Sequence, residues 1–254
     1  LAARAEGGGG GSSSSSSSSS SSTEAGVRRV FLLETEGIAK AGLKLDPLSL
    51  VPEQGVDALF GESAEEVDTL CRCIVAAIMC SRKVRRDSSM VSTLAGFPEA
   101  AAASPTDVLE VAGARLRMVY ADKRWVATTL ARFLALTRGP SAPTEGTGMR
   151  MAGWLLRRAS SGCDLLQSEA MPPDRVRSRL LVLRKDAPTL AEKAIARAQE
   201  EGVERLVFVL GAGDGRSSSL SRLAEDKMGG EAVSLGATPL LTSQCVSVLQ
   251  FLAD

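Results

Sequence analysis

The sequence predicts an α/β protein with a parallel β-sheet in the C-terminal part of the chain. Two observations carry this prediction. Short apolar runs typical of buried strands recur in residues 179–254, and stretches of good helix formers separate them. Strands that alternate with helices are joined by crossover connections, which make neighbouring strands parallel. Ligands collect at the carboxyl ends of the strands in such sheets, so we expect a binding site there.

The composition limits the kind of protein and of partner. The 254 residues are 44% hydrophobic and 24% charged, as expected of a globular protein with a sizeable core. Thirty basic and thirty acidic residues cancel, so an RNA-binding site would need a local basic patch. No apolar run is long enough to cross a membrane, and we expect no membrane partner. Five cysteines, an odd number, favour a reducing compartment, either the cytoplasm or an organelle.

The chain contains no histidine, which removes the commonest general base and metal ligand. Cys71, Cys73 and Cys80 lie in a predicted helix, and their spacing matches no usual zinc pattern. We therefore interpret them as small core residues and predict no metal site.

The first predicted unit is a disordered low-complexity tail over residues 1–26. Residues 7–11 are all glycine and residues 12–22 are all serine, and such a tract cannot bury apolar surface. A linker is one interpretation. The other is the remnant of a transit peptide for a plastid or a mitochondrion.

Residues 27–100 are predicted to form a small N-terminal RNA-binding domain. It begins with a strand over residues 27–34, followed by a turn-rich stretch over residues 44–55. Val67, Leu70 and Ile74 recur at helical spacing after a sequence typical of a capping box, residues 63–66. This helix ends in SRKVRR, residues 81–86, the densest basic patch of the chain.

The low-complexity stretch of residues 96–107 indicates a domain boundary, and we assign residues 105–254 to a second domain. Its first part contains one or two strands in residues 108–120, a helix over residues 123–138, a loop over residues 139–148 and a helical stretch over residues 149–160. In its last part, predicted strands and helices alternate regularly. The predicted strands cover residues 179–184, 205–211 and 231–236, and the predicted helices cover residues 187–202, 217–230 and 243–254.

The glycine-rich turn after the strand of residues 205–211 is compatible with several cofactors. A dinucleotide-binding G-x-G-x-x-G pattern would need glycine where Arg216 stands, and no acidic residue ends the next strand. VLGAGDGR, residues 209–216, resembles the first motif of Rossmann-like S-adenosylmethionine methyltransferases. However, most of that fold's sheet follows this motif, and here the chain ends at residue 254.

A third resemblance fits the position of this turn. GAGDGRS (residues 211–217), VSLG (residues 233–236) and PLLTSQ (residues 239–244) occur in the order and local spacing of the SPOUT-class RNA methyltransferases. Within that class they are most similar to the RsmE type, which methylates N3 of a uridine in 16S ribosomal RNA. VRRVFL, from Val27, resembles the strand that opens the small RNA-binding barrel of that family.

The resemblance implies a trefoil knot in the C-terminal domain, S-adenosylmethionine as cofactor, ribosomal RNA as substrate, and a homodimer through the knot with residues 245–252 in the interface. In the family, main-chain groups of the knot loops hold the cofactor. The matching residues here are Leu183, Gly211, Gly213, Gly215, Leu235, Gly236, Leu240 and Thr242.

The catalytic candidates are Asp214, as acceptor of the N3 proton, and Arg216, as a cation that stabilises the anionic base. The alternative is that Asp214 caps the following helix and that Arg216 lies in solvent. The candidates for phosphate contacts are Arg28, Arg29, Arg82, Lys83, Arg85 and Arg86.

The chain departs from the RsmE pattern at two positions of the knot loop. Leu241 and Ser243 stand where that family has arginine and glutamate. These departures leave open an alternative function, a catalytically degenerate SPOUT fold that binds RNA or assists ribosome assembly.

Overall fold

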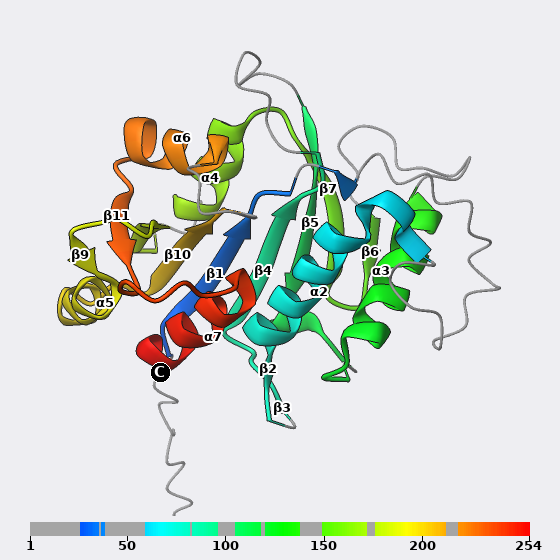
Figure 1. The fold of residues 1–254 in the computed structure, drawn as a ribbon, viewed down its shortest axis with the longest axis horizontal. Helices are drawn as coiled ribbons and strands as arrows, with labels where there is room; N and C mark the ends of the chain where they lie inside the picture. The colour runs from blue at the N-terminus through cyan, green and yellow to red at the C-terminus, as the bar shows by residue number, and fades with distance from the viewer. Residues whose placement is uncertain are drawn as a thin grey trace, which may run out of the picture.

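A computed structural model describes residues 26–35, 37–38, 59–81, 83–95, 105–117, 120–137, 149–171, 176–211 and 218–254. Its main feature is a nine-stranded mixed sheet in the order β6-β7-β5-β4-β1-β10-β8-β11-β9 (Figure 1). The strands are β1 (Arg28–Leu33), β4 (Ser88–Thr93), β5 (Thr106–Ala112), β6 (Met149–Met151), β7 (Trp154–Ala159), β8 (Ser178–Leu183), β9 (Thr189–Leu190), β10 (Arg205–Leu210) and β11 (Glu231–Ser234). A short hairpin, β2 (Met79–Cys80) with β3 (Lys83–Val84), lies outside it. The predicted α/β class is therefore confirmed.

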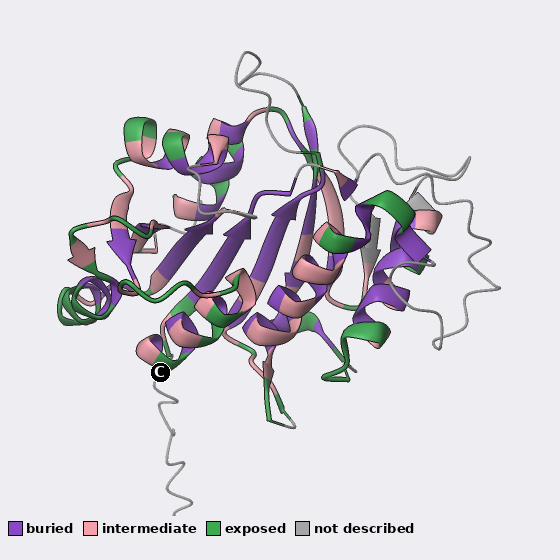
Figure 2. Cartoon of the chain, viewed as in Figure 1, coloured by how far each residue is buried: buried purple, intermediate pink, exposed green. Residues whose placement is uncertain are grey.

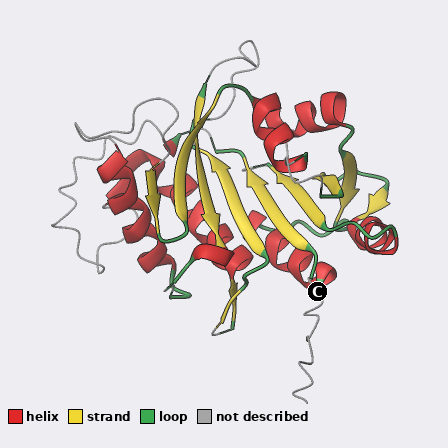
Figure 3. Ribbon diagram, turned by 180° about the vertical axis from the view of Figure 1, so that it is seen from behind, coloured by secondary structure: helices red, strands yellow, loops and turns green. Residues whose placement is uncertain are grey.

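Helices cover both faces of the sheet. They are α2 (Ala64–Ile78), α3 (Lys123–Thr137), α4 (Gly162–Ala170), α5 (Ala191–Glu200), α6 (Ser219–Met228) and α7 (Thr242–Ala253), with the 3-10 turns η2 (Gly61–Ser63) and η3 (Gly113–Arg115). Apolar residues of α2, α3, α5 and α7 pack on one face, and those of α4 and α6 pack on the other, which is seen from behind in Figure 3. None of the described helices is long and apolar enough to span a membrane.

The central strand β1 shows why both faces need cover. Phe31 and Leu33 belong to the core under α2 and α7, whereas Val30 and Leu32 belong to the core under α4 and α6. Because successive side chains of a strand point to opposite faces, a strand covered on both sides is apolar throughout. Figure 2 shows the middle of the sheet as buried.

The two predicted domains are not separated in the structure. β1, from residues 27–100, lies between β4 and β10 and pairs in parallel with both. Its Phe31 stacks on Phe208 of β10, with ring centroids 5.2 Å apart. The described residues on either side of the expected boundary thus share one sheet, and a separate N-terminal barrel is not confirmed. A short apolar strand has the same sequence pattern whether it belongs to a small barrel or pairs in parallel within a larger sheet.

The alternation predicted for the C-terminal part is confirmed. β8, β10 and β11 are parallel, and α5, α6 and α7 follow the expected pattern with ends shifted by a few residues. β8 lies between β10 and β11, although it precedes both in the chain. α7 then packs against α2 and α5, so the chain returns from the β11 edge toward the middle of the sheet (Figure 1).

The helical prediction for residues 149–160 is wrong. This segment forms the antiparallel hairpin β6–β7, and β7 pairs with β5 along its length. Gly153, with φ of 95°, makes the tight turn between the two strands. Leu155 and Leu156 have a high helix propensity, but the pairing of this segment with β5 makes it a strand.

Helix α2 begins where the sequence predicts, but its capping box does not form. Ser63 makes no cap hydrogen bond. Its hydroxyl donates to the carbonyl of Gly37 at 2.9 Å, and Glu66 Oε2 accepts from Gly37 N at 2.7 Å. Both side chains therefore hold the chain segment that follows β1 instead of the helix end.

Candidate functional site

The carboxyl ends of β8, β10 and β11 form the candidate site. These neighbouring parallel strands end at Leu183, Leu210 and Ser234. The structure thus brings together four of the predicted cofactor residues at one edge, namely Leu183, Gly211, Leu235 and Gly236. This is the position at which parallel sheets bind ligands.

The turn after β11 is held in place by its own polar groups. The Ser234 hydroxyl donates to the carbonyl of Lys185 at 3.1 Å and accepts from Gly236 N at 3.1 Å. Gly236 has φ of 100°, a conformation that favours glycine, and no atom lies within 4 Å of the position a Cβ would occupy. Its main chain is therefore both fixed and accessible.

Leu240 and Thr242 lie between this turn and the body of α7. Leu240 is half-buried, and Thr242 is the first residue of the helix. Gln244 Oε1 accepts from Leu241 N at 2.8 Å and so closes the start of α7. The assignment of these two residues to a cofactor stays a prediction.

The glycine loop between β10 and α6 contains Gly213, Asp214, Gly215 and Arg216, and these residues lie outside the described ones. Two hydrogen bonds fix the start of α6, where the loop ends. Ser218 caps α6 by accepting from Ser221 N at 3.1 Å, and Glu34 Oε2 accepts from Leu220 N at 2.8 Å.

Glu34 was not among the predicted site residues. It is buried directly after β1 and ties the start of α6 to the sheet beside Gly211. A charged residue that ends an apolar strand, as in RRVFLLE, is the sequence signal that could have indicated it.

A second polar cluster at this edge was also missed. Arg184, directly after β8, binds both carboxylate oxygens of Asp186 at 3.2 and 3.1 Å and Glu225 of α6 at 3.2 Å. The hydrogen bond from Arg184 lowers the pKa of Asp186. The other carboxylate oxygen of Glu225, Oε1, is buried and has no hydrogen-bond partner. It is an acceptor available to a ligand.

These residues suit an adenosyl cofactor. Leu183, Leu235 and Leu240 are only partly buried, so they offer apolar surface to an adenine ring. Gly211 and Gly236 offer main-chain groups, and Glu225 Oε1 could accept from a hydroxyl or ammonium group.

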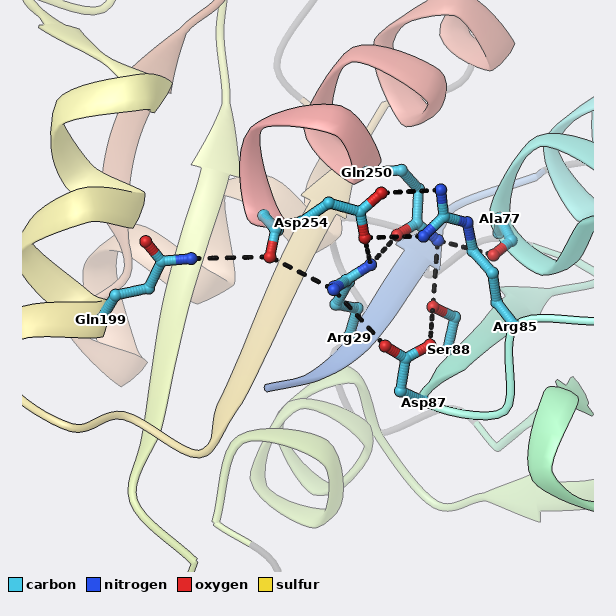
Figure 4. A network of polar contacts seen from close by, with 9 residues as sticks. Arg29, Ala77, Arg85, Asp87, Ser88, Gln199, Gln250 and Asp254 are labelled. Atoms are coloured by element: carbon cyan, nitrogen blue, oxygen red, sulfur yellow. Dashed lines mark hydrogen bonds and ion pairs between the residues drawn. The ribbon is translucent and has the colours of Figure 1, made fainter. Parts of the chain in front are cut away.

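Two of the predicted RNA-binding arginines, Arg29 and Arg85, lie at the opposite, amino end of the strands, in a network shown in Figure 4. Arg29 is only 5% exposed. Its guanidinium donates to Gln250 Oε1 at 2.8 Å, to Asp254 Oδ1 at 2.6 Å and to the carbonyl of Ala253 at 3.2 Å. Arg29 therefore holds the end of α7 and is not available to a phosphate.

Two further predicted cations have structural contacts as well. Arg85 binds both carboxylate oxygens of Asp254 at 2.8 and 2.9 Å, and this lowers the pKa of Asp254 (Figure 4). Arg86 donates to the carbonyl of Gly113 at 3.0 Å and to that of Leu116. Lys83 and Arg28 are exposed, and Arg82 lies outside the described residues.

The cysteines of α2 fit their interpretation as core residues. Cys71 and Cys73 are buried, and burial raises the pKa of the Cys73 thiol to about 12 and that of Cys71 further. The interpretation is wrong for Cys80, which is exposed on β2. Within the described residues, no three potential ligands lie together as a metal site would require.

Comparison with known proteins gives three related sequences. Each is named a tRNA (pseudouridine(54)-N(1))-methyltransferase. The proteins of Methanococcus maripaludis and Methanococcus aeolicus are 23% and 24% identical to this chain, over 76% of it and 86% of their own length. The protein of Methanococcoides burtonii is 25% identical over 74% of this chain and 82% of its own. This chain resembles tRNA methyltransferases. No protein-family model matches it.

The comparisons support an RNA methyltransferase and agree with the SPOUT class. They do not support the RsmE type, because all three relatives are named for tRNA and for N1 of pseudouridine. The expectation of a ribosomal RNA uridine N3-methyltransferase is corrected accordingly. The motifs that suggested it describe how main chain surrounds a cofactor, and such motifs say little about which base is methylated.

Proposed function

We propose that this protein uses S-adenosylmethionine to methylate N1 of a pseudouridine in tRNA. The observation that carries the proposal is the similarity to three enzymes named for this reaction, over 74–76% of the chain. The sheet edge at Leu183, Gly211 and Gly236 supports it, because these neighbouring strand ends offer main-chain groups and apolar surface to an adenosyl cofactor.

The proposed chemistry is a methyl transfer to nitrogen. The N1 lone pair of the base forms a bond to the methyl carbon, the carbon–sulfur bond breaks, and the N1 proton leaves. The cofactor supplies an activated methyl group on a sulfonium and departs as the neutral thioether. The protein acts mainly by placing the base in line with that bond and by supporting the change of charge.

The chain's own residues have separate tasks in this proposal. Gly211, Leu235 and Gly236 would hold the cofactor through main chain and apolar contact. Glu34 and Ser218 would fix the return of the glycine loop to α6. Asp214 would accept the N1 proton and Arg216 would stabilise the anionic base, roles proposed from their position in that loop.

We also propose the knot and the homodimer. The strand order β10-β8-β11 and the return of α7 toward α2 favour a chain end that passes under an earlier loop. Phe251 of α7 is 78% exposed, and a second copy of the chain would cover it.

The alternative function, a catalytically degenerate SPOUT fold that only binds RNA or assists ribosome assembly, loses its main support. Leu241 and Ser243 depart from the RsmE pattern, but the relatives of this chain are not of that type. These two positions therefore no longer argue against catalysis.

The test uses two tRNA transcripts that differ only in having pseudouridine or uridine at position 54. Uridine has no free N1, because its sugar is attached there, whereas N3 is free in both bases. Incubation with S-adenosylmethionine and mass spectrometry of the nucleosides should show methylation of the pseudouridine transcript alone. Methylation of both transcripts would indicate N3 chemistry and would overturn the proposal.

A further inference from the structure

The residues predicted to contact RNA do not account for how the proposed enzyme binds tRNA. The chain has no net charge, so a bound RNA needs a local group of cations. Three of the predicted cations, Arg29, Arg85 and Arg86, bind groups of the protein itself. Phosphate contacts therefore need basic residues other than these three.

A second basic segment lies between β5 and α3 and was not predicted. Leu116 is buried, and the residues on either side, Arg115 and Arg117, are exposed. Leu116 packs against the turn at Gly153, and Arg86 binds the carbonyl oxygens of Gly113 and Leu116. The arginine expected to bind RNA thus supports the turn that presents two others.

An exposed aromatic ring accompanies these cations. Tyr120, the chain's only tyrosine, is 61% exposed. Trp125 of α3 meets it edge-on, with ring centroids 5.8 Å apart and an interplanar angle of 68°. The contact restricts the tyrosine ring and leaves most of its surface open. An exposed, oriented aromatic ring in a chain segment that also carries exposed cations is a combination on which single-stranded bases stack.

The surroundings of this segment favour an anionic partner. No carboxylate in the described part of the chain forms an ion pair with Arg115, Arg117 or Arg124, whereas Lys123 pairs with Asp68 at 2.6 Å. A groove of about 440 Å³ leads from Ala121 and Lys123 along α2 to the start of α7. One of its lining residues, Ser243, is next to the predicted cofactor residue Thr242.

We propose that Arg115, Arg117, Tyr120 and Arg124 form an RNA-binding surface, the β5–α3 surface. The three arginines contact backbone phosphates, and Tyr120 stacks on the base of an unpaired nucleotide. This inference rests on the proposed function and deepens it, because it names where the RNA outside the target base is held.

The test measures binding of the full-length protein to a fluorescently labelled tRNA transcript by anisotropy at several salt concentrations. The variants are Tyr120→Ala, Tyr120→Phe and the double variant Arg115→Ala/Arg117→Ala. The matched control is Lys193→Ala/Lys227→Ala, which removes two exposed cations from α5 and α6. Thermal unfolding and calorimetry with S-adenosylmethionine confirm that each variant is folded.

Tyr120→Ala should weaken binding by about 5- to 100-fold, and Tyr120→Phe by much less, since stacking needs only the ring. The double arginine variant should reduce the slope of log Kd against log salt by about 1 to 2, while the control leaves affinity nearly unchanged. Equal weakening in the control, or no effect of Tyr120→Ala, would overturn the β5–α3 surface. Failure of the unmodified protein to bind any tRNA would instead overturn the proposed function.

Discussion

Replacing Arg29 by methionine tests whether the network of Figure 4 holds α7 on the sheet. Methionine keeps an apolar stem and removes the hydrogen bonds to Gln250, Asp254 and Ala253. Removing one member of a buried ion pair costs about 3–5 kcal/mol. Arg29 also forms an ion pair with Asp87 at 3.4 Å. Asp254 and Asp87 are 46% and 34% exposed, so water can replace part of what they lose. We therefore expect a loss of about 2–4 kcal/mol in the free energy of unfolding.

Urea unfolding followed by circular dichroism measures this loss, with the m-value expected to stay constant. In thermal unfolding it corresponds to a decrease in Tm of about 4–16 °C for a chain of this size. Lys83→Met is the matched control, because Lys83 is exposed on β3, and it should change stability by less than about 0.5 kcal/mol. If Arg29→Met lowered the free energy of unfolding no more than this control does, Arg29 would not hold the C-terminal helix.

The same network predicts a dependence of stability on acid pH. The pKa of Asp254 is lowered, first by hydrogen bonds from Arg85 and also by those from Arg29. A carboxyl with a lowered pKa stabilises the folded state above its ordinary pKa of about 4, and this contribution is lost as the pH falls through the folded value. Arg29→Met should therefore lose less stability below pH 4 than the unmodified protein does.

Three further outcomes follow from the structure. Gly236→Ala introduces a Cβ at φ of 100°, so it should cost about 1–3 kcal/mol in stability and weaken S-adenosylmethionine binding in calorimetry, whereas Ala237→Gly next to it should not. Ellman's reagent should label Cys80 rapidly in the native protein and reach Cys71 and Cys73 only after unfolding, and fast labelling of all three would show that α2 is not packed as described. Phe251→Glu should convert a dimer into a monomer in analytical ultracentrifugation, and a dimer that survives it would place the interface elsewhere.

The sequence was sufficient for the C-terminal half of the sheet. β8 and β10 are compact apolar runs, and glycines follow the ends of α5 and α6, so the local pattern alone indicated their positions. It was not sufficient for β1, because the partner of Phe31 is Phe208, far away in the chain. The hairpin of β6 and β7 was missed for the same reason, since its pairing with β5 is not a local property.

The candidate site was predicted in part. Strand ends and glycines indicated Gly211 and Gly236, but nothing local shows that Glu34 meets the start of α6. The basic cluster of residues 81–86 was recognised by its charge, although the partners of Arg85 and Arg86 become visible only in three dimensions. A run of arginines in a sequence does not show whether they bind another molecule or hold the fold together.

The most direct test of the central claim is the nucleoside product formed from S-adenosylmethionine and tRNA. The account predicts N1-methylpseudouridine from the transcript with pseudouridine at position 54, and no methylated nucleoside from the matching uridine transcript. A methylated uridine from the second transcript, or no product from the first when both ligands are shown to bind, would contradict it.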